Sequence, residues 1–341
     1  MSLADRLFPL TVANGSAVAR LHELEGAVVC TMSEPWALLA DAVPEPLHLI
    51  EAGSVELGHL AELAATVPDG AKVVVGVGGG SSIDTAKFVA GACQLPLLQI
   101  PTIISVDAAF TVPYGYRDGS RVRYAGSATP FEVIADPQLI RRAPPELNRA
   151  GVGDLLSCHT GMFDWKVAIE AGRGEIPWNE EAAALGRRVL DDLEAALPEI
   201  AVVSEDGVRE LARLHQVVGA GCAEYGARFE EGSEHFLAYV FEWLTNEHRV
   251  HGELVSFCVL VMSLVQGNDP ERAVRIVRGA LVEASSEHLR IDLALLERMF
   301  AELPGYCERE GLWPSVVETV DLTPELARAA FEHVRAATGP A

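Results

Sequence analysis

Three consecutive glycines, Gly78, Gly79 and Gly80, stand where an apolar, β-branched run meets a stretch with helical periodicity. Glycine has no Cβ atom, so a ligand can approach the backbone closely at such a turn. The start of the following helix offers unpaired N–H groups and a positive dipole end. The pattern therefore favours binding of a diphosphate. The spacing does not meet GxGxxG, because Ser81 occupies the third position, and a tight turn without a ligand is the alternative interpretation.

Asp84 and Lys87 lie one helical turn apart just after these glycines. Taken alone, the two residues predict an exposed ion pair on the helix surface. The carboxylate of Asp84 is favoured there because it lies near the positive end of the helix dipole.

The elements that hold this loop alternate between strands and helices through about the first 150 residues. Strands are expected at 27–31, 47–50, 72–77 and 96–100, and helices at 55–65 and 82–93. This alternation implies parallel pairing with right-handed crossovers. Residues 112–126 contain glycine, tyrosine and arginine with little periodicity, and they are expected to form a hairpin or an excursion over the site.

Helical patterns dominate after about residue 144. The expected helices are 155–171, 180–197, 207–225, 235–244, 251–265, 270–284, 291–303 and 324–337. Two of them carry capping signals, Thr323 before Pro324 and Asp269 before Pro270. The sequence thus predicts an α/β, Rossmann-like N-terminal domain over residues 1–148 and an all-α C-terminal domain over residues 149–341.

The charge balance narrows the classes of partner. The chain has 341 residues, with 49 acidic against 26 basic side chains and a formal net charge of −23. Such a surface repels phosphate backbones and anionic lipids, so neither nucleic acid nor a membrane is an expected partner. We find no secretory signal, no spanning apolar run and no CxxC pair among the six cysteines. A cytoplasmic protein with free thiols is therefore expected.

Several motifs resemble one protein family. Gly-Gly-Gly-Ser-x-x-Asp-x-Ala-Lys at 78–87 resembles the cofactor loop of the iron-containing alcohol dehydrogenase and dehydroquinate synthase superfamily. Further segments resemble the glycerol-1-phosphate dehydrogenases within it, at 101–107, 135–137, 143–147, 150–154, 164–165, 232–235 and 251–253. The resemblance extends from about residue 73 to residue 255.

The resemblance implies a dehydroquinate synthase-like fold that binds NAD or NADP and one divalent metal in a cleft between the two domains. The cofactor-binding residues that it implies are Gly78, Gly79, Gly80, Ser81, Asp84, Lys87, Thr102 and Ser105. Asp107 would face the substrate and, alone or through a water molecule, would help to relay the proton.

The metal ligands that the resemblance implies are Asp154, His235 and His251. One carboxylate and two imidazoles suit Zn²⁺ or Fe²⁺, with zinc favoured over iron, and leave positions open for a substrate oxygen. Taken singly, each residue has an ordinary structural interpretation, such as a helix N-cap for Asp154. His159 and His248 are alternative ligands, because each lies close to a member of the set in the sequence.

The chain departs from the family at two places beside these ligands. Glu230 and Glu231 precede the Gly-Ser-Glu-His segment, where two carboxylates disfavour an anionic, phosphorylated substrate. Tyr239 stands four residues after His235, where relatives often have a second histidine, and it is a poorer proton relay at neutral pH. The first strand ends in Cys30-Thr31 without an aspartate for the ribose, which leaves NADP acceptable.

The function expected is a metal-dependent, NAD(P)-linked alcohol dehydrogenase or carbonyl reductase acting on a small polar alcohol, aldehyde or ketone. A sugar-phosphate cyclase of the dehydroquinate synthase type is the nearest alternative. It is disfavoured because Asp107 is followed by Ala108 and Ala109 without a lysine, and Lys166 is the only lysine after Lys87. A non-catalytic binding protein is a third possibility. The expected partners are a small-molecule substrate and at least one further copy of the chain, as a dimer or larger homo-oligomer.

Overall fold

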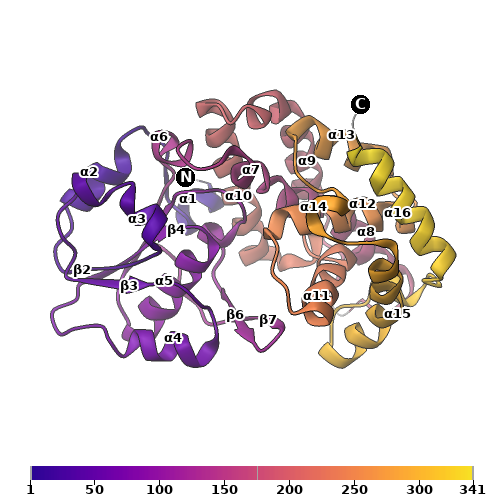
Figure 1. Ribbon diagram of the computed structural model, residues 1–341, viewed down its shortest axis with the longest axis horizontal. Coiled ribbons are helices and arrows are strands. Elements are labelled where there is room, and N and C mark those ends of the chain that lie inside the picture. Colours follow the sequence, from indigo (N-terminus) through magenta and orange to yellow (C-terminus); the bar gives the residue numbers. More distant parts are fainter. Residues whose placement is uncertain (1, 175, 340–341) are drawn as a thin grey trace. The chain divides into compact units, whose positions relative to one another are not determined.

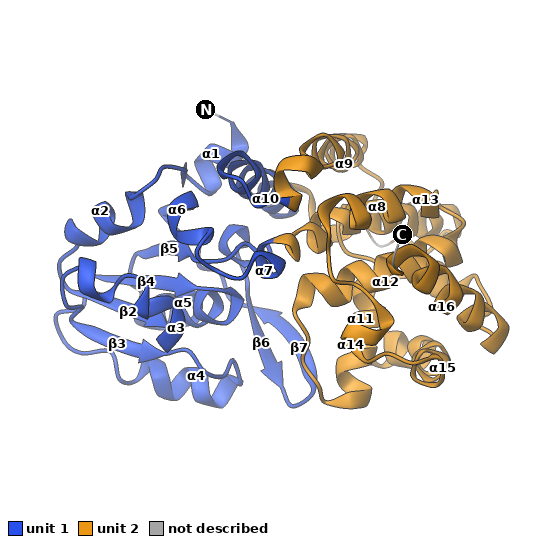
Figure 2. Cartoon of the chain, turned by 45° about the horizontal axis from the view of Figure 1, so that its top comes forward, with its two compact units in different colours: residues 1–148, 202–223 blue, residues 149–201, 224–341 orange. Residues whose placement is uncertain are grey.

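The chain divides into two compact units in a computed structural model that describes residues 2–174 and 176–339. The first unit comprises residues 1–148 and 202–223, and the second comprises residues 149–201 and 224–341 (Figure 2). One boundary falls after Asn148, and residues 202–223, which the sequence-based division assigned to the C-terminal domain, pack with the first unit. Two contacts show why: Gln216 Nε2 donates to Phe8 O at 2.8 Å, and a Cβ atom on Gly219 would lie 1.9 Å from Phe110 O.

The first unit is built on a six-stranded parallel sheet in the order β1-β8-β5-β4-β2-β3. The strands are β1 Leu10–Thr11, β2 Ala27–Thr31, β3 His48–Glu51, β4 Val73–Gly78, β5 Leu97–Pro101 and β8 Glu132–Ile134. The four strands expected from the sequence are confirmed. The short edge strand β1 and the three-residue β8 were not expected, because they are too brief to show a period.

Helices cover both faces of this sheet (Figure 1). Alternate residues of β4 point to opposite sides, so Val74 packs in a core with α5 while Val75 packs in a core with α2. The first core lies under α4 Leu57–Ala64 and α5 Gly80–Cys93, and the second under α2 Ser16–His22, α3 Ser33–Ala37 and α6 Pro137–Ile140. This is the doubly wound arrangement that the alternation of strands and helices predicts.

The rest of the first unit surrounds the sheet. Its remaining elements are α1 Leu3–Leu7, η1 Ala40–Ala42, η2 Ala108–Phe110, α7 Pro145–Arg149 at the boundary and most of α10 Glu205–Tyr225. Residues 112–126 form an antiparallel hairpin, β6 Tyr114–Asp118 with β7 Arg121–Ala125, as one of the two sequence-based interpretations expected.

The second unit is helical. It contains α8 Val152–Glu170, α9 Glu180–Ala201, η3 Ala227–Phe229, α11 Ser233–Thr245, α12 His251–Gln266, α13 Pro270–Ala280, α14 Ser286–Leu289, α15 Leu293–Glu310, η4 Val316–Glu318 and α16 Pro324–Thr338. Helix α12 is almost entirely buried and packs against α8, α11, α13 and α16. The side chains of Thr323 and Asp269 cap α16 and α13, as expected. Among the described residues, no helix is long and apolar enough to span a membrane.

Candidate metal centre and cofactor loop

Three side chains of the second unit converge, although they are far apart in the sequence. One ligand atom each from Asp154, His235 and His251 lies within 4.8 Å of the other two. The Oδ1 atom of Asp154 is 3.5 Å from Nε2 of His251, and the two imidazole rings have centroids 5.5 Å apart. Asp154 and His235 are buried, whereas the His251 side chain is 31% exposed. The cluster is therefore reachable from one side.

Each of these residues lies in the first turn of a helix, and two of the helices approach unusually closely. Asp154 follows Gly153 on α8, and His251 precedes Gly252 on α12. A Cβ atom on Gly153 would lie 2.3 Å from Gly252 O, so only glycine permits this approach. The pair of glycines thus brings the carboxylate and the imidazole within reach of one ion.

Glu234 orients the imidazole of His235. Its Oε1 atom lies 3.0 Å from His235 Nδ1 and accepts the backbone N–H of Gly232 at 2.7 Å. A carboxylate on Nδ1 leaves Nε2 to serve as the metal ligand and makes the ring more basic. The side chain of Glu234 is fully buried, and its Oε2 atom has no hydrogen-bond partner among the residues that the structure describes.

The charges around His235 suit a cation. Burial alone would lower the pKa of His235, but the hydrogen bond that the ring donates to Glu234 and the charges of Glu230 and Glu231 raise that pKa to about 10. The surroundings thus stabilise positive charge at this ring. A divalent ion held by one carboxylate and two imidazoles would supply such charge and match the ligand preferences of Zn²⁺ and Fe²⁺. The residues present therefore fit a metal site.

The two alternative histidines take other partners. His159 Nε2 lies 2.6 Å from Asn268 O, and Asn268 donates back to His159 O at 2.8 Å. His248 is half exposed and lies beside Glu242, with 3.8 Å between Nδ1 and Oε1. Neither histidine belongs to the group of ligand atoms around Asp154.

The glycine loop of the first unit joins β4 to α5 with little room for side chains. Gly78 has φ +146°, a conformation that side-chain-bearing residues rarely adopt, and a Cβ atom there would lie 2.5 Å from Ser82 Oγ. A Cβ atom on Gly79 would lie 2.8 Å from Ile103 Cδ1. Gly80 begins α5, whose first N–H groups lack partners within the helix. The backbone here can hold a diphosphate.

The other residues expected to bind the cofactor surround this loop in different ways. Ser81 is exposed, whereas Thr102 and Ser105 are buried. Thr102 N donates to Gly78 O at 3.0 Å, which joins the segment after β5 to the glycine turn. Asp107 is half-buried at the start of η2.

Asp84 and Lys87 differ from the exposed ion pair that their spacing alone predicts. The Lys87 side chain has no exposed surface, and the two charged groups are 3.8 Å apart. Burial raises the pKa of Asp84 to about 6, against the opposing effects of Lys87 and the Gly115 N–H. A lysine without exposed surface offers no atom to a ligand in this structure. The role of Lys87 therefore depends on its partners within the protein.

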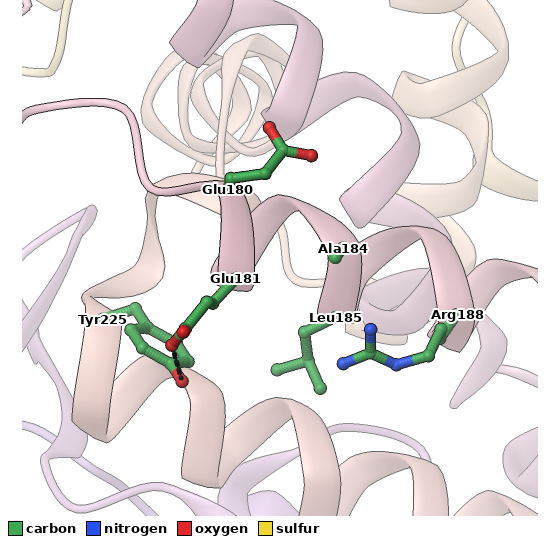
Figure 3. A pocket seen from close by; sticks show the side chains of 6 residues that line it. All are labelled: Glu180, Glu181, Ala184, Leu185, Arg188 and Tyr225. Atoms are coloured by element: carbon green, nitrogen blue, oxygen red, sulfur yellow. Dashed lines mark hydrogen bonds between the residues drawn. The ribbon is translucent and has the colours of Figure 1, made fainter.

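A pocket elsewhere on the second unit contains none of the expected site residues. Five residues of α9 and the last residue of α10 line it, namely Glu180, Glu181, Ala184, Leu185, Arg188 and Tyr225 (Figure 3). Tyr225 OH donates to Glu181 Oε2 at 3.3 Å across it. The chemistry of this pocket is that of a solvated helix surface.

Comparisons with known proteins agree with this arrangement. Residues 15–144 match the family model described as iron-containing alcohol dehydrogenase. The glycerol-1-phosphate dehydrogenase [NAD(P)+] of Pyrobaculum neutrophilum is 31% identical over 235 residues, covering 66% of this chain and 68% of that protein. The chain belongs to the iron-containing alcohol dehydrogenase family. A second relative of the same name, from Methanococcoides burtonii, is 29% identical over 60% of this chain.

Solved structures of other proteins share the fold. A probable glycerol dehydrogenase from Sinorhizobium meliloti matches 97% of this chain and 98% of its own with a TM-score of 0.74 at 22% identity. The glycerol dehydrogenase of Schizosaccharomyces pombe matches 96% of this chain and 89% of its own with a TM-score of 0.72 at 19% identity. The alignments to the Methanococcoides burtonii and Methanothrix thermoacetophila relatives span 57% and 62% of those proteins.

Sequence reasoning missed the residues that support the three candidate metal ligands. Glu234 was not singled out, although a carboxylate adjacent to a candidate ligand histidine is a signal of a metal-site partner. The glycines beside Asp154 and His251 were not recognised as a helix contact. A glycine next to a ligand on each of two helices is a usable signal, but only once the two helices are known to cross.

Proposed function

We propose that this chain is a metal-dependent, NAD(P)-linked dehydrogenase of a small polar alcohol, acting in the reverse direction as a reductase of the aldehyde or ketone. The convergence of Asp154, His235 and His251 is the observation that carries the proposal. Membership of the iron-containing alcohol dehydrogenase family and the glycine turn at Gly78 support it.

The proposed chemistry divides between the two units. In the second unit, Asp154, His235 and His251 would hold a divalent ion, which would supply Lewis acidity toward the substrate oxygen, while the nicotinamide would supply the hydride chemistry. Glu234 keeps the His235 ring oriented. In the first unit, the backbone from Gly78 to Ser81 binds the diphosphate. Asp107 exchanges the proton of the substrate hydroxyl through its carboxylate, directly or through a water molecule.

The proposed substrate carries no phosphate. Glu230 and Glu231 lie close enough to raise the pKa of His235, and Tyr239 OH donates to Glu231 Oε1 at 2.7 Å. The guanidinium of Arg228 is buried and donates to Pro314 O at 2.7 Å, so it is engaged within the protein. A neutral polyol, or its carbonyl counterpart, is the substrate class that these charges favour. We further propose that the enzyme uses NAD or NADP and functions as a homo-oligomer.

The decisive experiment combines metal analysis with a spectroscopic assay. Wild-type protein should hold about one divalent ion per chain and change the reduced-nicotinamide absorbance with polyols or aldehydes, and chelation should abolish the change. The variant His235→Ala should lose both the ion and the activity. His248→Ala is the matched control, because it removes a nearby histidine outside the cluster and should leave metal content unchanged. Equal metal content in wild type and His235→Ala would contradict the assignment.

A further inference from the structure

Lys87 has a buried ammonium group, and its partners among the described residues belong to the first unit. Nζ donates to Thr111 Oγ1 at 2.6 Å and to Pro113 O at 2.9 Å, and it lies 3.8 Å from Asp84 Oδ1. The side chain has no exposed surface. Lys87 therefore joins α5, which begins at the glycine turn, to the segment that follows η2.

Asp84 adds a third tie between α5 and this segment. Its carboxylate accepts the backbone N–H of Gly115 in β6, and a Cβ atom on Gly115 would lie only 3.1 Å from Asp84 Oδ2. Residues 111, 113 and 115 are thus all held by one turn of α5. Because these positions span the end of η2 and the first residues of the hairpin, they set where the hairpin begins.

The η2 turn, which precedes this segment, is held by separate contacts. Phe110 packs edge-on against Phe8 at 6.3 Å between ring centroids, and its carbonyl lies against Gly219 of α10. Asp107, whose backbone carbonyl accepts the Phe110 N–H at 2.7 Å, lies within this anchored turn. The carboxylate of Asp107 is also close enough to Lys87 to influence the pKa of the lysine. Burial lowers the pKa of Lys87, and the charges of Asp84 and Asp107 raise it.

Stability alone does not account for a lysine here. Replacing a buried ion pair by well-packed apolar residues is often neutral or stabilising, because the charges no longer have to be desolvated. A lysine retained in such a place instead specifies one arrangement of the groups that it bonds, since its three N–H donors demand particular acceptors. The acceptors at Lys87 are Thr111 and Pro113, which lie just after η2, and the carboxylate of Asp84 is nearby.

We propose that Lys87 is a positioning residue: it fixes the Asp107 turn and the hairpin β6–β7 in the geometry needed for substrate, and it does not bind the cofactor. The inference rests on the proposed dehydrogenase function, in which Asp107 faces the substrate. It assigns to Lys87 a role different from the cofactor contact that the sequence motif implies.

The test uses Lys87→Met, which preserves the side-chain length, and Asp84→Asn/Lys87→Met, which removes both buried charges. Amide hydrogen exchange of the full-length protein should increase over residues 107–118 in both variants and remain unchanged in β4. The Kd of the reduced cofactor, followed by nicotinamide fluorescence, should stay within about threefold of wild type, whereas kcat/KM for the alcohol should fall on the order of tenfold or more. Lys72→Met is the control, because Lys72 is an exposed lysine of the same unit paired with Glu25.

Three results would overturn the proposal. Unchanged exchange over residues 107–118 would show that Lys87 does not hold the segment. A cofactor Kd that weakens in proportion to kcat/KM would show that Lys87 acts on the cofactor. Faster exchange with unchanged kcat/KM would show that the reaction does not need the position. Absence of turnover in the wild-type protein would instead contradict the proposed function, and the exchange comparison would still decide whether Lys87 fixes the segment.

Discussion

Carboxylates in the protein interior accompany two of the candidate functional side chains and one helix start, and their hydrogen-bond partners differ. Glu234 orients the imidazole of His235, and Asp84 accompanies the ammonium of Lys87. Asp164 accepts backbone N–H groups from Ser233 at 2.7 Å and Val316 at 2.8 Å, so it ties the start of α11 and η4 to α8. A buried carboxylate is stabilised only by such bonds, and they explain why these acidic side chains lie inside.

The pKa of Asp164 makes stability depend on pH. Burial, with a further contribution from Glu234, raises this pKa to about 6 from 3.8. The folded state therefore binds the proton more tightly, so the contribution of Asp164 to the unfolding free energy is largest below pH 3.8 and is lost as pH rises through about 6. The unfolding free energy of wild type relative to Asp164→Asn should fall by on the order of 1–3 kcal/mol between pH 4.5 and pH 7.5, and most of the fall should occur below about pH 6. Urea unfolding followed by tryptophan fluorescence measures the unfolding free energy of both proteins. Parallel pH profiles for wild type and Asp164→Asn would contradict this prediction.

The role of a single residue was easier to predict where a sequence motif surrounded it than elsewhere. Asp154, His235 and His251 were named before their positions were known, because the resemblance supplied their order along the chain. The environment of Lys87 was not predicted, because its partners Thr111 and Pro113 follow a strand and a short helix whose path no local pattern specifies. Burial of a charged side chain depends on such distant partners.

The starts of helices position the three candidate metal ligands. Asp154, His235 and His251 each lie within the first turn of α8, α11 or α12, and the contact at Gly153 and Gly252 sets the separation of two of these turns. The backbone at a helix start has a well-defined position, since the turns that follow fix it. The spacing between the ligands is thus determined by helix packing more than by any loop.

Gly153→Ala tests this helix contact. The added methyl group would lie 2.3 Å from Gly252 O, so α8 and α12 must separate. We expect metal affinity to fall on the order of tenfold to a hundredfold, and the unfolding free energy to fall by about 1–3 kcal/mol. Gly305→Ala is the matched control, because Gly305 lies in α15 with nothing within 4 Å of a Cβ atom. That control should keep metal affinity, measured by competition with a chelator, whereas equal affinities for wild type and Gly153→Ala would refute the argument.

Strands and long helices were predictable because their hydrophobic periods are long enough to recognise. The expected helix 270–284 ends at Ala280, since Leu281 adopts a left-handed conformation with φ +57°. The expected helix 291–303 instead continues to Glu310 with Pro304 inside it. The membership of residues 202–223 in the first unit was not predictable, because an amphipathic helix shows which face is buried but not which core receives it.

The charge of the whole molecule and the charges beside His235 act in the same direction on a substrate. A net charge of −23 repels anions over a Debye length, which is ~10 Å at 0.1 M salt. The charges of Glu230 and Glu231 act at shorter range, where salt screens them less. Long-range and local repulsion can be separated because only the first falls steeply with ionic strength.

Substrate selectivity should therefore follow charge. We expect kcat/KM for a neutral polyol to exceed that for its phosphorylated counterpart by about tenfold or more at low ionic strength, and added salt to narrow the ratio only in part. Glu231→Gln keeps the acceptor for Tyr239 OH while removing one charge beside His235, and it should raise kcat/KM for the phosphorylated substrate alone. Glu62→Gln removes the same charge from an exposed position in the first unit, so it reports the effect of net charge without a local change. If the two variants changed kcat/KM for the phosphorylated substrate equally, the selectivity would come from the overall charge. If wild type had the higher kcat/KM for the phosphorylated polyol, Glu230 and Glu231 would not be a barrier to phosphate.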